Sequence, residues 1–105
     1  MAFDLSINSV DVLEVSVIGD LDINNVDLFR NSVIERFDEE NKDVVLDFKA
    51  LDYIDSTGLG AIIAIYKEVK EAGKTIKVIN AKRNIKKLFV ITELDSLFEI
   101  GDQNG

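Results

Sequence analysis

The 105-residue sequence contains no cysteine, no histidine and no proline. Without cysteine the chain has no disulfide, no thiolate nucleophile and no cysteine-ligated metal site. Without histidine it lacks the commonest general base and the commonest zinc ligand, which excludes a Ser-His-Asp triad. Proline is absent and the glycines are few and scattered, so no segment resembles an interdomain linker. Its chemistry must therefore rest on carboxylates, hydroxyls, lysines and backbone amides.

Long apolar runs are also missing. The longest strongly apolar stretch, residues 59–66, is too short to cross a bilayer, and the first four residues do not begin a secretory signal. A chain of 105 residues that is 47% hydrophobic and 30% charged is typical of one folded domain. We therefore expect a single domain over residues 1–105 that is soluble, cytoplasmic and monomeric, with a frayed tail at residues 101–105.

Positive charge is scarce. Twelve basic residues stand against 20 acidic ones, for a net charge of -8. The imbalance lies in residues 1–55, which hold 14 acidic and 4 basic residues. This balance argues against nucleic acid as a ligand, because phosphate binding requires basic surface. We interpret the basic residues between 67 and 87 as a solvated helix face, since Glu68 and Glu71 alternate with them at helical spacing. The charge balance favours a basic protein partner.

Hydrophobic periodicity predicts strands that alternate with helices. Residues 3–7 and 13–17 alternate apolar with polar residues and predict a hairpin, while residues 26–37 and 59–69 have helical spacing. Further strands are expected at 44–46 and 75–79, a short helix around 85–89, and a last edge strand at 97–100. The predicted order is ββαβαβα(β). It indicates an α/β fold, with a mixed β-sheet of four to five strands and helices packed on it.

Several boundaries follow from local signals. Gly19 to Asp22 are expected to interrupt the second strand, and Asn24 or Asn25 to cap the first long helix. Residues 38–43 are expected to form a polar turn, and Gly73 to end the second long helix. The apolar run at 44–46 is typical of an interior strand that is covered on both faces.

Two polar segments fall at the carboxyl ends of predicted strands, where sites gather in open α/β sheets. One is Gly19-Asp20-Leu21-Asp22, and the other is the sequence Asp-Ser-Thr-Gly-Leu-Gly at residues 55–60. The hydroxyl of Ser56 or Thr57 would cap the helix that follows. Glycine inside a helix is unfavourable, so the two glycines in the second segment suggest a close approach to the helix backbone.

The start of that helix also suits a phosphate, because its free N–H groups and dipole favour an anion. A phosphorylated Ser56 would place about 1.5 to 2 negative charges beside Asp55. Free and phosphorylated serine would then present opposite surfaces to a partner. Competing motifs are missing: there is no phosphate-binding P-loop, no dinucleotide fingerprint and no Gly-x-Ser-x-Gly elbow. One structural rival remains, an acidic magnesium pocket formed by Asp20, Asp22 and Asp47 as in a response-regulator receiver.

The two segments, with residues 74–79 and 85–89 after them, resemble the STAS domain, and more narrowly the bacterial anti-sigma-factor antagonists. The resemblance spans residues 3–100. The string at residues 55–60 is its most specific part. One departure follows the first segment, where Asn25-Val26 stands in place of the Thr-Ala that is frequent in the family, which puts partner specificity in doubt more than fold. Asparagine also caps helices.

The resemblance implies partner switching. The unphosphorylated protein would bind an anti-sigma factor and thereby free a sigma factor. That anti-sigma factor would be an ATP-dependent serine kinase, which would phosphorylate Ser56 and then dissociate. A PP2C-type phosphatase would reverse the step. The resemblance implies no enzyme activity, cofactor or metal, and it places partner contacts on these residues: Asp20, Asp22, Asn24, Asp55, Ser56, Thr57, Gly58, Leu59 and Gly60. Two alternatives remain: a STAS scaffold within a larger signalling assembly, and a receiver-like domain that binds metal or nucleotide.

Overall fold

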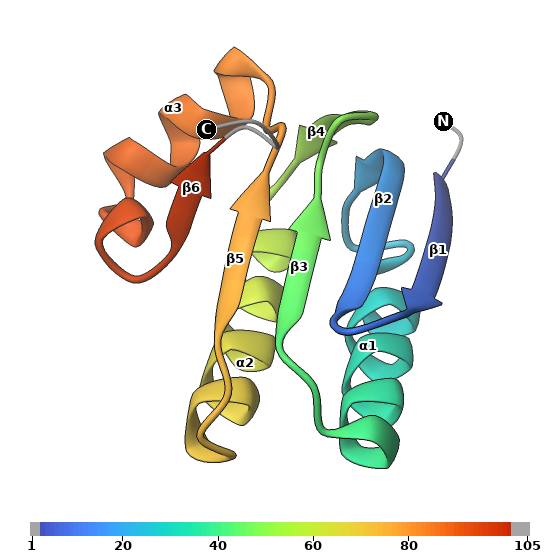
Figure 1. Cartoon of the computed structure of the whole chain (residues 1–105). Helices are drawn as coiled ribbons and strands as arrows, with labels where there is room; N and C mark the ends of the chain where they lie inside the picture. The colour runs from blue at the N-terminus through green and yellow to red at the C-terminus, as the bar shows by residue number, and fades with distance from the viewer. Residues whose placement is uncertain (1–2, 102–105) are drawn as a thin grey trace.

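The computed structural model describes residues 3–101 (Figure 1). The elements in chain order are β1 (Phe3–Ser9), β2 (Leu13–Leu21), α1 (Val26–Glu40), β3 (Val44–Asp47), β4 (Leu51–Ile54), α2 (Ser56–Glu71), β5 (Ile76–Ile79), α3 (Arg83–Ile91), the 3-10 turn η1 (Leu94–Ser96) and β6 (Glu99–Gly101). The predicted α/β class is confirmed, with one strand more than expected, the short β4. From residue 102 on, the expected frayed tail lies outside the described residues.

Six strands form one mixed sheet within the described residues. The order across the sheet is β1-β2-β3-β5-β6, and β4 pairs with β2 beyond the end of β3. The hairpin of β1 and β2 is antiparallel, as the alternation predicted, and every other pair is parallel. The strand expected at residues 97–100 is β6, at the edge beside β5. The carboxyl ends of the parallel strands lie at one edge of the sheet, and the candidate functional site described below lies at this edge.

The strand β2 changes its partner partway along. Residues 13–16 of β2 pair with β3, and residues 19–21 pair with β4, with a register shift between Gly19 and Asp20. Gly19 has a φ of 90°, a conformation that favours glycine, and its N–H donates to the Ala50 carbonyl at 2.8 Å. The expectation that residues 19–22 interrupt the strand is right in part: the pairing register shifts between Gly19 and Asp20, but β2 continues to Leu21.

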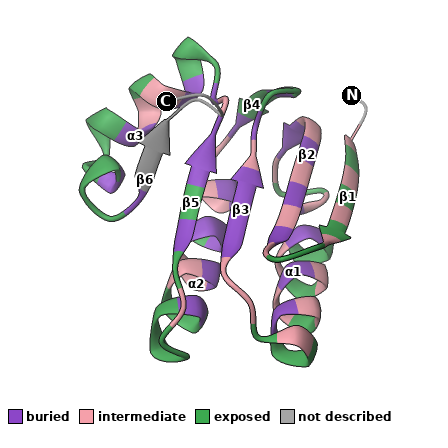
Figure 2. Cartoon of the chain, viewed as in Figure 1, coloured by how far each residue is buried: buried purple, intermediate pink, exposed green. Residues whose placement is uncertain are grey.

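The helices α1 and α2 lie side by side on one face of the sheet (Figure 1). Buried residues, purple in Figure 2, occur on both helices and on the central strands, and they belong to one hydrophobic core cluster. In α1 the four residues with helical spacing are all buried. In α2 the buried stripe is rotated from the expected one: Ile62 and Val69 are buried, but Leu59, Ile63 and Tyr66 are only partly buried. The core residues are Val26, Phe29, Val33 and Phe37 in α1, and Ala61, Ile62, Ile65 and Val69 in α2.

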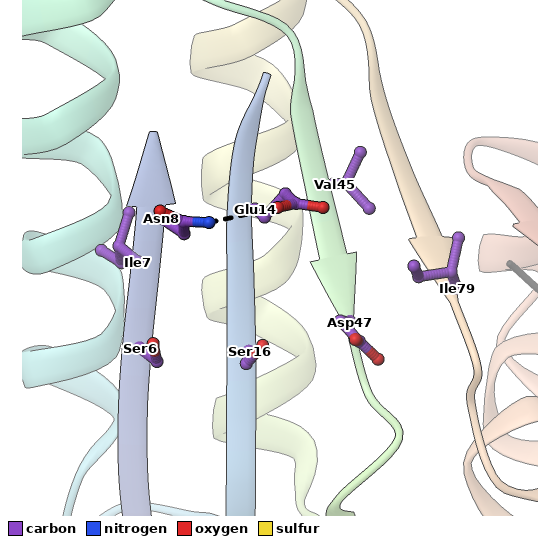
Figure 3. Close-up of a pocket in the computed structure, with 8 residues that line it drawn as sticks. All are labelled: Ser6, Ile7, Asn8, Glu14, Ser16, Val45, Asp47 and Ile79. Atoms are coloured by element: carbon purple, nitrogen blue, oxygen red, sulfur yellow. Dashed lines mark hydrogen bonds between the residues drawn. The ribbon is translucent and has the colours of Figure 1, made fainter. Parts of the chain in front are cut away.

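The opposite face of the sheet is not covered by α1 or α2 (Figure 1). Val45 of β3 lies on this face, where it lines a hollow of about 390 Å³ together with Ser6, Ser16 and Asp47 (Figure 3). Val45 is 9% exposed, because side chains of neighbouring strands surround it. The interpretation of residues 44–46 as a strand covered on both faces is therefore only half right: α1 and α2 cover one face, and the other face contains the hollow.

The helix ends show two further outcomes. The helix α1 runs through Glu40, so the polar turn expected at 38–43 begins later, at Asn41 in the left-handed conformation. Arg36 pairs with Glu40 at 3.0 Å and supports this last turn. The helix α2 ends as predicted near Gly73, which has a φ of 77°. The Gly73 and Lys74 N–H groups donate back into the last turn, as in a Schellman motif.

The helix α3 is held by aromatic contacts. Phe89 meets Phe48 at a centroid distance of 6.4 Å and Phe98 at 5.8 Å, and Phe98 in turn meets Tyr66 of α2 at 5.1 Å. These contacts close the sheet edge near β5 and β6. Across residues 3–101, none of the helices combines the length and apolar character that a membrane span requires.

Candidate functional site

The two polar segments singled out in the sequence meet at the carboxyl edge of the sheet. Leu21 at the end of β2 pairs with Ile54 at the end of β4, and the Asp55 N–H donates to the Leu21 carbonyl at 3.2 Å. The loop of residues 22–25 and the start of α2 therefore leave the sheet side by side. The sequence predicted that both segments lie at this edge, but their link through β4 was not predicted.

Asp55, not Ser56 or Thr57, caps α2. Its backbone is extended, with φ -103° and ψ -175°, and its Oδ1 accepts the Gly58 N–H at 3.0 Å and the Thr57 hydroxyl at 2.6 Å. This correction has a physical reason: a carboxylate accepts two hydrogen bonds here, and it occupies the position that precedes the first helical residue. Ser56 is that first residue, and it is exposed.

The capping contacts keep Asp55 ionised. The Thr57 hydroxyl and the Gly58 N–H hold the pKa of the Asp55 carboxyl below its ordinary value of 3.8, and the N–H groups of Thr57 and Ile23 add to this, against a smaller desolvation effect. A fixed negative charge therefore stands next to Ser56. Within residues 3–101, the Ser56 hydroxyl itself takes part in no hydrogen bond to protein. The hydroxyls of these two adjacent residues therefore differ, because that of Thr57 donates to Asp55.

The loop before α1 is closed by one asparagine. The Asn25 side chain accepts the Asp22 N–H at 3.0 Å and donates to the Asp20 carbonyl at 2.7 Å. The Asp22 carboxylate accepts the Asn24 N–H at 2.9 Å, and its carbonyl accepts the N–H groups of Asn25 and Val26. Asn25 precedes the helix, but its side chain makes no capping bond to α1. Asn25 thus occupies the N-cap position, as one of the two expected residues, but its side chain makes no capping bond because its amide orders the loop instead.

The predicted contact residues divide into exposed and buried ones. Ser56, Asn24 and Gly60 are exposed, and Asp22, Asp55, Thr57 and Leu59 are partly exposed. Asp20 is only 6% exposed, and Gly58 is buried. Asp20 sits within the strand, opposite Tyr53 in the parallel register. The edge thus brings seven of the nine residues to the surface around Ser56.

The two glycines of residues 55–60 have different surroundings. A Cβ on Gly58 would lie 2.7 Å from Ile54 Cγ1 and 2.9 Å from the Leu21 carbonyl oxygen, so the packing of α2 onto β2 and β4 excludes any side chain there. A Cβ on Gly60 would meet nothing within 4 Å. The close approach inferred from the sequence is therefore internal at Gly58 and open to the outside at Gly60.

The receiver-like acidic pocket does not form. Asp47 pairs in register with Ser16, four residues before Asp20 on β2, which separates the two by roughly 13 Å along the strand. The Asp47 carboxylate accepts the Lys49 N–H at 3.0 Å and the Asn80 side-chain amide at 3.2 Å. Among the described residues, no group of three or more carboxylates is placed to hold a metal ion.

One surface residue was missed in the sequence. Ile23, between Asp22 and Asn24, has a 70% exposed side chain, and its N–H faces the Asp55 carboxylate. Sequence patterns did not reveal it, because a single apolar residue in a loop has no periodicity. An isoleucine inside a polar loop beside a candidate site was the one available signal.

Comparison with known proteins agrees with this geometry. The family model of the STAS domain matches residues 6–104. An anti-sigma-B factor antagonist of Bacillus subtilis (strain 168) is 36% identical over 58 residues, which are 55% of this chain and 53% of that protein. The chain thus matches about half the length of this curated relative.

Solved structures share the fold. A Thermotoga maritima protein described as a candidate anti-sigma factor antagonist superposes with a TM-score of 0.85 at 26% identity, covering 96% of this chain and 86% of the other. The Bacillus cell fate determinant SpoIIAA in its phosphorylated form gives a TM-score of 0.74 at 18% identity, over 98% and 94% of the two chains, which is a likeness of fold alone. The sheet order and the capped helix agree with the family match, and the chain belongs to the STAS domain family.

Proposed function

We propose that this protein is an anti-sigma-factor antagonist whose phosphoacceptor is Ser56. The observation that carries the proposal is the free hydroxyl at the first residue of the 16-residue helix α2, next to an ionised aspartate that is already committed to capping. The 36% identical relative is itself an anti-sigma-B factor antagonist, and a structural neighbour was solved in a phosphorylated form. Both support this assignment.

In the proposed mechanism the protein acts by binding and by accepting a phosphate, and it supplies no catalytic group. Its unphosphorylated edge, formed by the loop of residues 22–25 and the start of α2, binds an anti-sigma factor and so releases a sigma factor. This action takes place in the cytoplasm, where RNA polymerase uses the sigma factor. The anti-sigma factor is also a kinase: it transfers the terminal phosphoryl group of ATP to the Ser56 oxygen, ADP is released, and the hydroxyl proton passes to a base of the kinase.

Phosphorylation reverses the binding through local charge. The phosphate adds about 1.5 to 2 negative charges beside the ionised Asp55, at a surface that the partner covers. When the partner covers this surface, the phosphate must lose water beside the Asp55 charge, which is costly for a buried charge, and each step of about 1.4 kcal/mol in that cost is tenfold in affinity. The helix dipole and free N–H groups still accommodate the phosphate within the fold. A PP2C-type phosphatase restores the free serine.

The first prediction is that Ser56 is the sole phosphoacceptor. With the purified anti-sigma factor kinase of the same organism and ATP, the wild-type protein and Thr57→Ala should each gain one phosphate by intact-mass analysis, whereas Ser56→Ala should gain none. Thr57 is spared because its hydroxyl donates to Asp55 at 2.6 Å.

The binding arm of this experiment uses the same kinase. Ser56→Ala should stay bound in the presence of ATP, and Ser56→Asp should bind at least about 10-fold more weakly. Full phosphorylation of Ser56→Ala, or equal binding by Ser56→Asp and wild type, would reject the proposed function.

A further inference from the structure

The strand β1 leaves its outer edge unpaired within the described residues. It is the outermost strand of the sheet, on the right of Figure 1, and β2 is its one partner there. Its register with β2 is regular over all seven residues, and its sequence holds no proline and no lysine. Natural sheets use prolines, lysines and bulges to protect a long edge, because its free N–H and C=O groups can pair with another strand. The edge of β1 carries none of these devices and is suited to pairing.

Two hollows follow this edge, between β1 and α1. The first, of about 240 Å³, is lined by Phe3, Asp4, Leu5, Leu28 and Ser32. The second, of about 360 Å³, is lined by Leu5, Ile7, Ser32, Glu35, Arg36 and Glu39. Leu5 and Ser32 belong to both lists, so the two hollows adjoin at these residues and form one groove.

The helix side of the groove is complementary to itself. Leu28, an apolar side chain that is 59% exposed, stands beside the first hollow, one helical turn before Ser32. Arg36, which lines the second hollow, lies one turn after Ser32. A projecting side chain and a hollow therefore lie at equal distances on either side of Ser32. A two-fold rotation about this point would bring Leu28 of one copy to the second hollow of the other.

The strand side of the groove has the same symmetry. Phe3 and Ile7 lie two residues before and after Leu5, and all three are partly buried apolar residues that pack against the core. Two residues of a strand and four residues of a helix both span about 6 to 7 Å. One axis near Leu5 and Ser32 therefore suits both elements, and it sets Phe3 of one strand opposite Ile7 of the other.

We propose that this protein forms a two-fold symmetric dimer through the edge of β1 and the groove between β1 and α1. The two β1 strands pair antiparallel about Leu5, so the six-stranded sheet continues from one copy into the other. Leu28 of each copy enters the second hollow of the other copy, next to Ile7. The proposal departs from the monomer that the sequence predicts, and it does not rest on the proposed function.

Charge decides the register more than the affinity. The one charged residue of β1 is Asp4, whose carboxylate accepts the Leu5 N–H at 2.8 Å, and in the dimer it faces Ser6 of the other strand. Arg36 pairs with Glu40 at 3.0 Å, so its aliphatic stem is left to line the hollow. Each copy has a net charge of -8, which opposes association. The apolar contacts must therefore drive the dimer, and salt should strengthen it.

Sedimentation of the purified protein alone tests the dimer. The average mass should rise from that of one chain toward that of two between about 1 μM and about 1 mM, the range of weak to moderate affinities. Raising NaCl from about 0.1 M to about 1 M should tighten the association, since the Debye length falls from about 10 Å to about 3 Å. A protein that stays monomeric at about 1 mM in both salts would overturn the inference and leave the edge to a segment of another protein.

The helix contact is tested at Leu28. Leu28→Ser should weaken dimerisation at least about 10-fold, because it removes the apolar side chain from both hollows at once. Its melting temperature should change little, since Leu28 is exposed in the single chain. Ile91→Ser is the matched control: it removes a 65% exposed isoleucine from α3, at the far end of the sheet from β1 (Figure 1), and should dimerise like the wild type.

The strand register is tested by charge at Ser6, an exposed residue of β1. Ser6→Asp would set two pairs of carboxylates against each other, and Ser6→Lys would set two lysines against the two Asp4 carboxylates. Dimer affinity should fall roughly 2- to 30-fold in the first variant and rise by a similar factor in the second. Ser16 pairs with Ser6 in register, one strand further from the edge, so Ser16→Asp and Ser16→Lys change the net charge equally and should have smaller effects.

These outcomes are independent of the kinase reaction at Ser56. A dimer that forms equally well with Leu28→Ser, or whose affinity does not follow the sign of the charge at Ser6, uses another surface and contradicts the inference. An association that weakens in high salt would do the same, because it would be driven by charge. Phosphorylation of Ser56 by an anti-sigma factor would stand or fall on its own measurement.

Discussion

Asp55 holds the start of α2 and the charge of the site at the same time. Its carboxylate accepts the Gly58 N–H and the Thr57 hydroxyl, so the cap exists in full only while the group is ionised. The pKa of the Asp55 carboxyl is lowered in the folded protein, chiefly by the Thr57 hydroxyl. A depressed folded-state pKa means that this stabilisation is present above the unfolded value of 3.8 and is lost as the pH falls through the folded value.

Asp55→Asn should therefore lower stability in a way that depends on pH. At pH 7 the variant should unfold at a lower urea concentration than the wild type, because an amide oxygen is a weaker acceptor than a carboxylate. Below the unfolded pKa of 3.8 the difference should shrink toward zero, since wild-type Asp55 becomes protonated. Urea titrations between pH 7 and 2.5 measure this. A difference that stays constant over that range would show that the charge of Asp55 does not stabilise α2.

At the scale of elements, the loop between β2 and α1 depends on one side chain. Asn25 joins the Asp22 N–H to the Asp20 carbonyl, and the loop they enclose lies beside Ser56. Asn24, the adjacent residue, contributes only its backbone N–H to the loop. The two asparagines thus differ in what their side chains do, which makes them a matched pair.

Asn25→Ala should destabilise the protein by about 1 to 3 kcal/mol, because it leaves two partly buried backbone groups without partners. It should also slow the phosphorylation of Ser56, because the loop that shapes the acceptor site loses its order. Asn24→Ala should change stability by less than about 0.5 kcal/mol, as surface substitutions usually do. Denaturant titration and phosphate incorporation rates test the pair. Equal stability of the two variants would contradict the ordering role of Asn25.

Element boundaries show what sequence reasoning reached and what it missed. The buried stripe of α1 and the hairpin of β1 and β2 were predictable, because periodicity records burial directly. The strand β4 could not be predicted in this way, because it has only four residues and two of them are exposed. Its pairing also depends on the left-handed conformation of Gly19 in β2, more than 30 residues earlier in the sequence. Neither feature leaves a local pattern.

The candidate site was predicted in position but not in detail. The string ending at Asp22 lies at the carboxyl end of β2, as predicted, and the string ending at Gly60 follows β4, a strand that was not predicted. The capping residue of α2 was missed because three candidates are adjacent, and only the extended backbone of Asp55 decides among them. The different surroundings of the two glycines depend on side chains of β2 and β4, which sequence alone does not place against the helix.

For the whole molecule, the core would limit how far the proposed phosphorylation of Ser56 acts. The helix α2 is anchored along its length by Ile62, Ile65 and Val69, which are fully buried against the sheet. Close-packed interiors do not deform gradually. A new charge at the first turn of α2 should therefore not cause a structural change that spreads through the domain. The exposed position of Ser56 also lets the phosphate project outward.

We therefore expect free and phosphorylated forms to share one backbone. Amide chemical shifts should change at Ser56 and the first turn of α2, and in residues 20–25, whose groups lie nearby. The strand β5 and the helix α3 should keep their shifts, and an unphosphorylated Ser56→Ala sample provides the reference for local effects of substitution. Broad changes that reach β5 or α3 would favour a transition that spreads through the fold.

The hydrogen bonds that close the loop before α1 also bear on the thermodynamics of recognition. Fixing the backbone of a residue costs roughly 1 to 2 kcal/mol of conformational entropy. In this protein the loop of residues 22–25 loses that entropy already on folding, because hydrogen bonds of Asn25 and Asp22 order it before any partner protein binds. Association then orders little new backbone, so a small and largely rigid contact suffices for tight binding. Such a preorganised surface should also be discriminating, because it cannot reshape itself to fit a partner of different form.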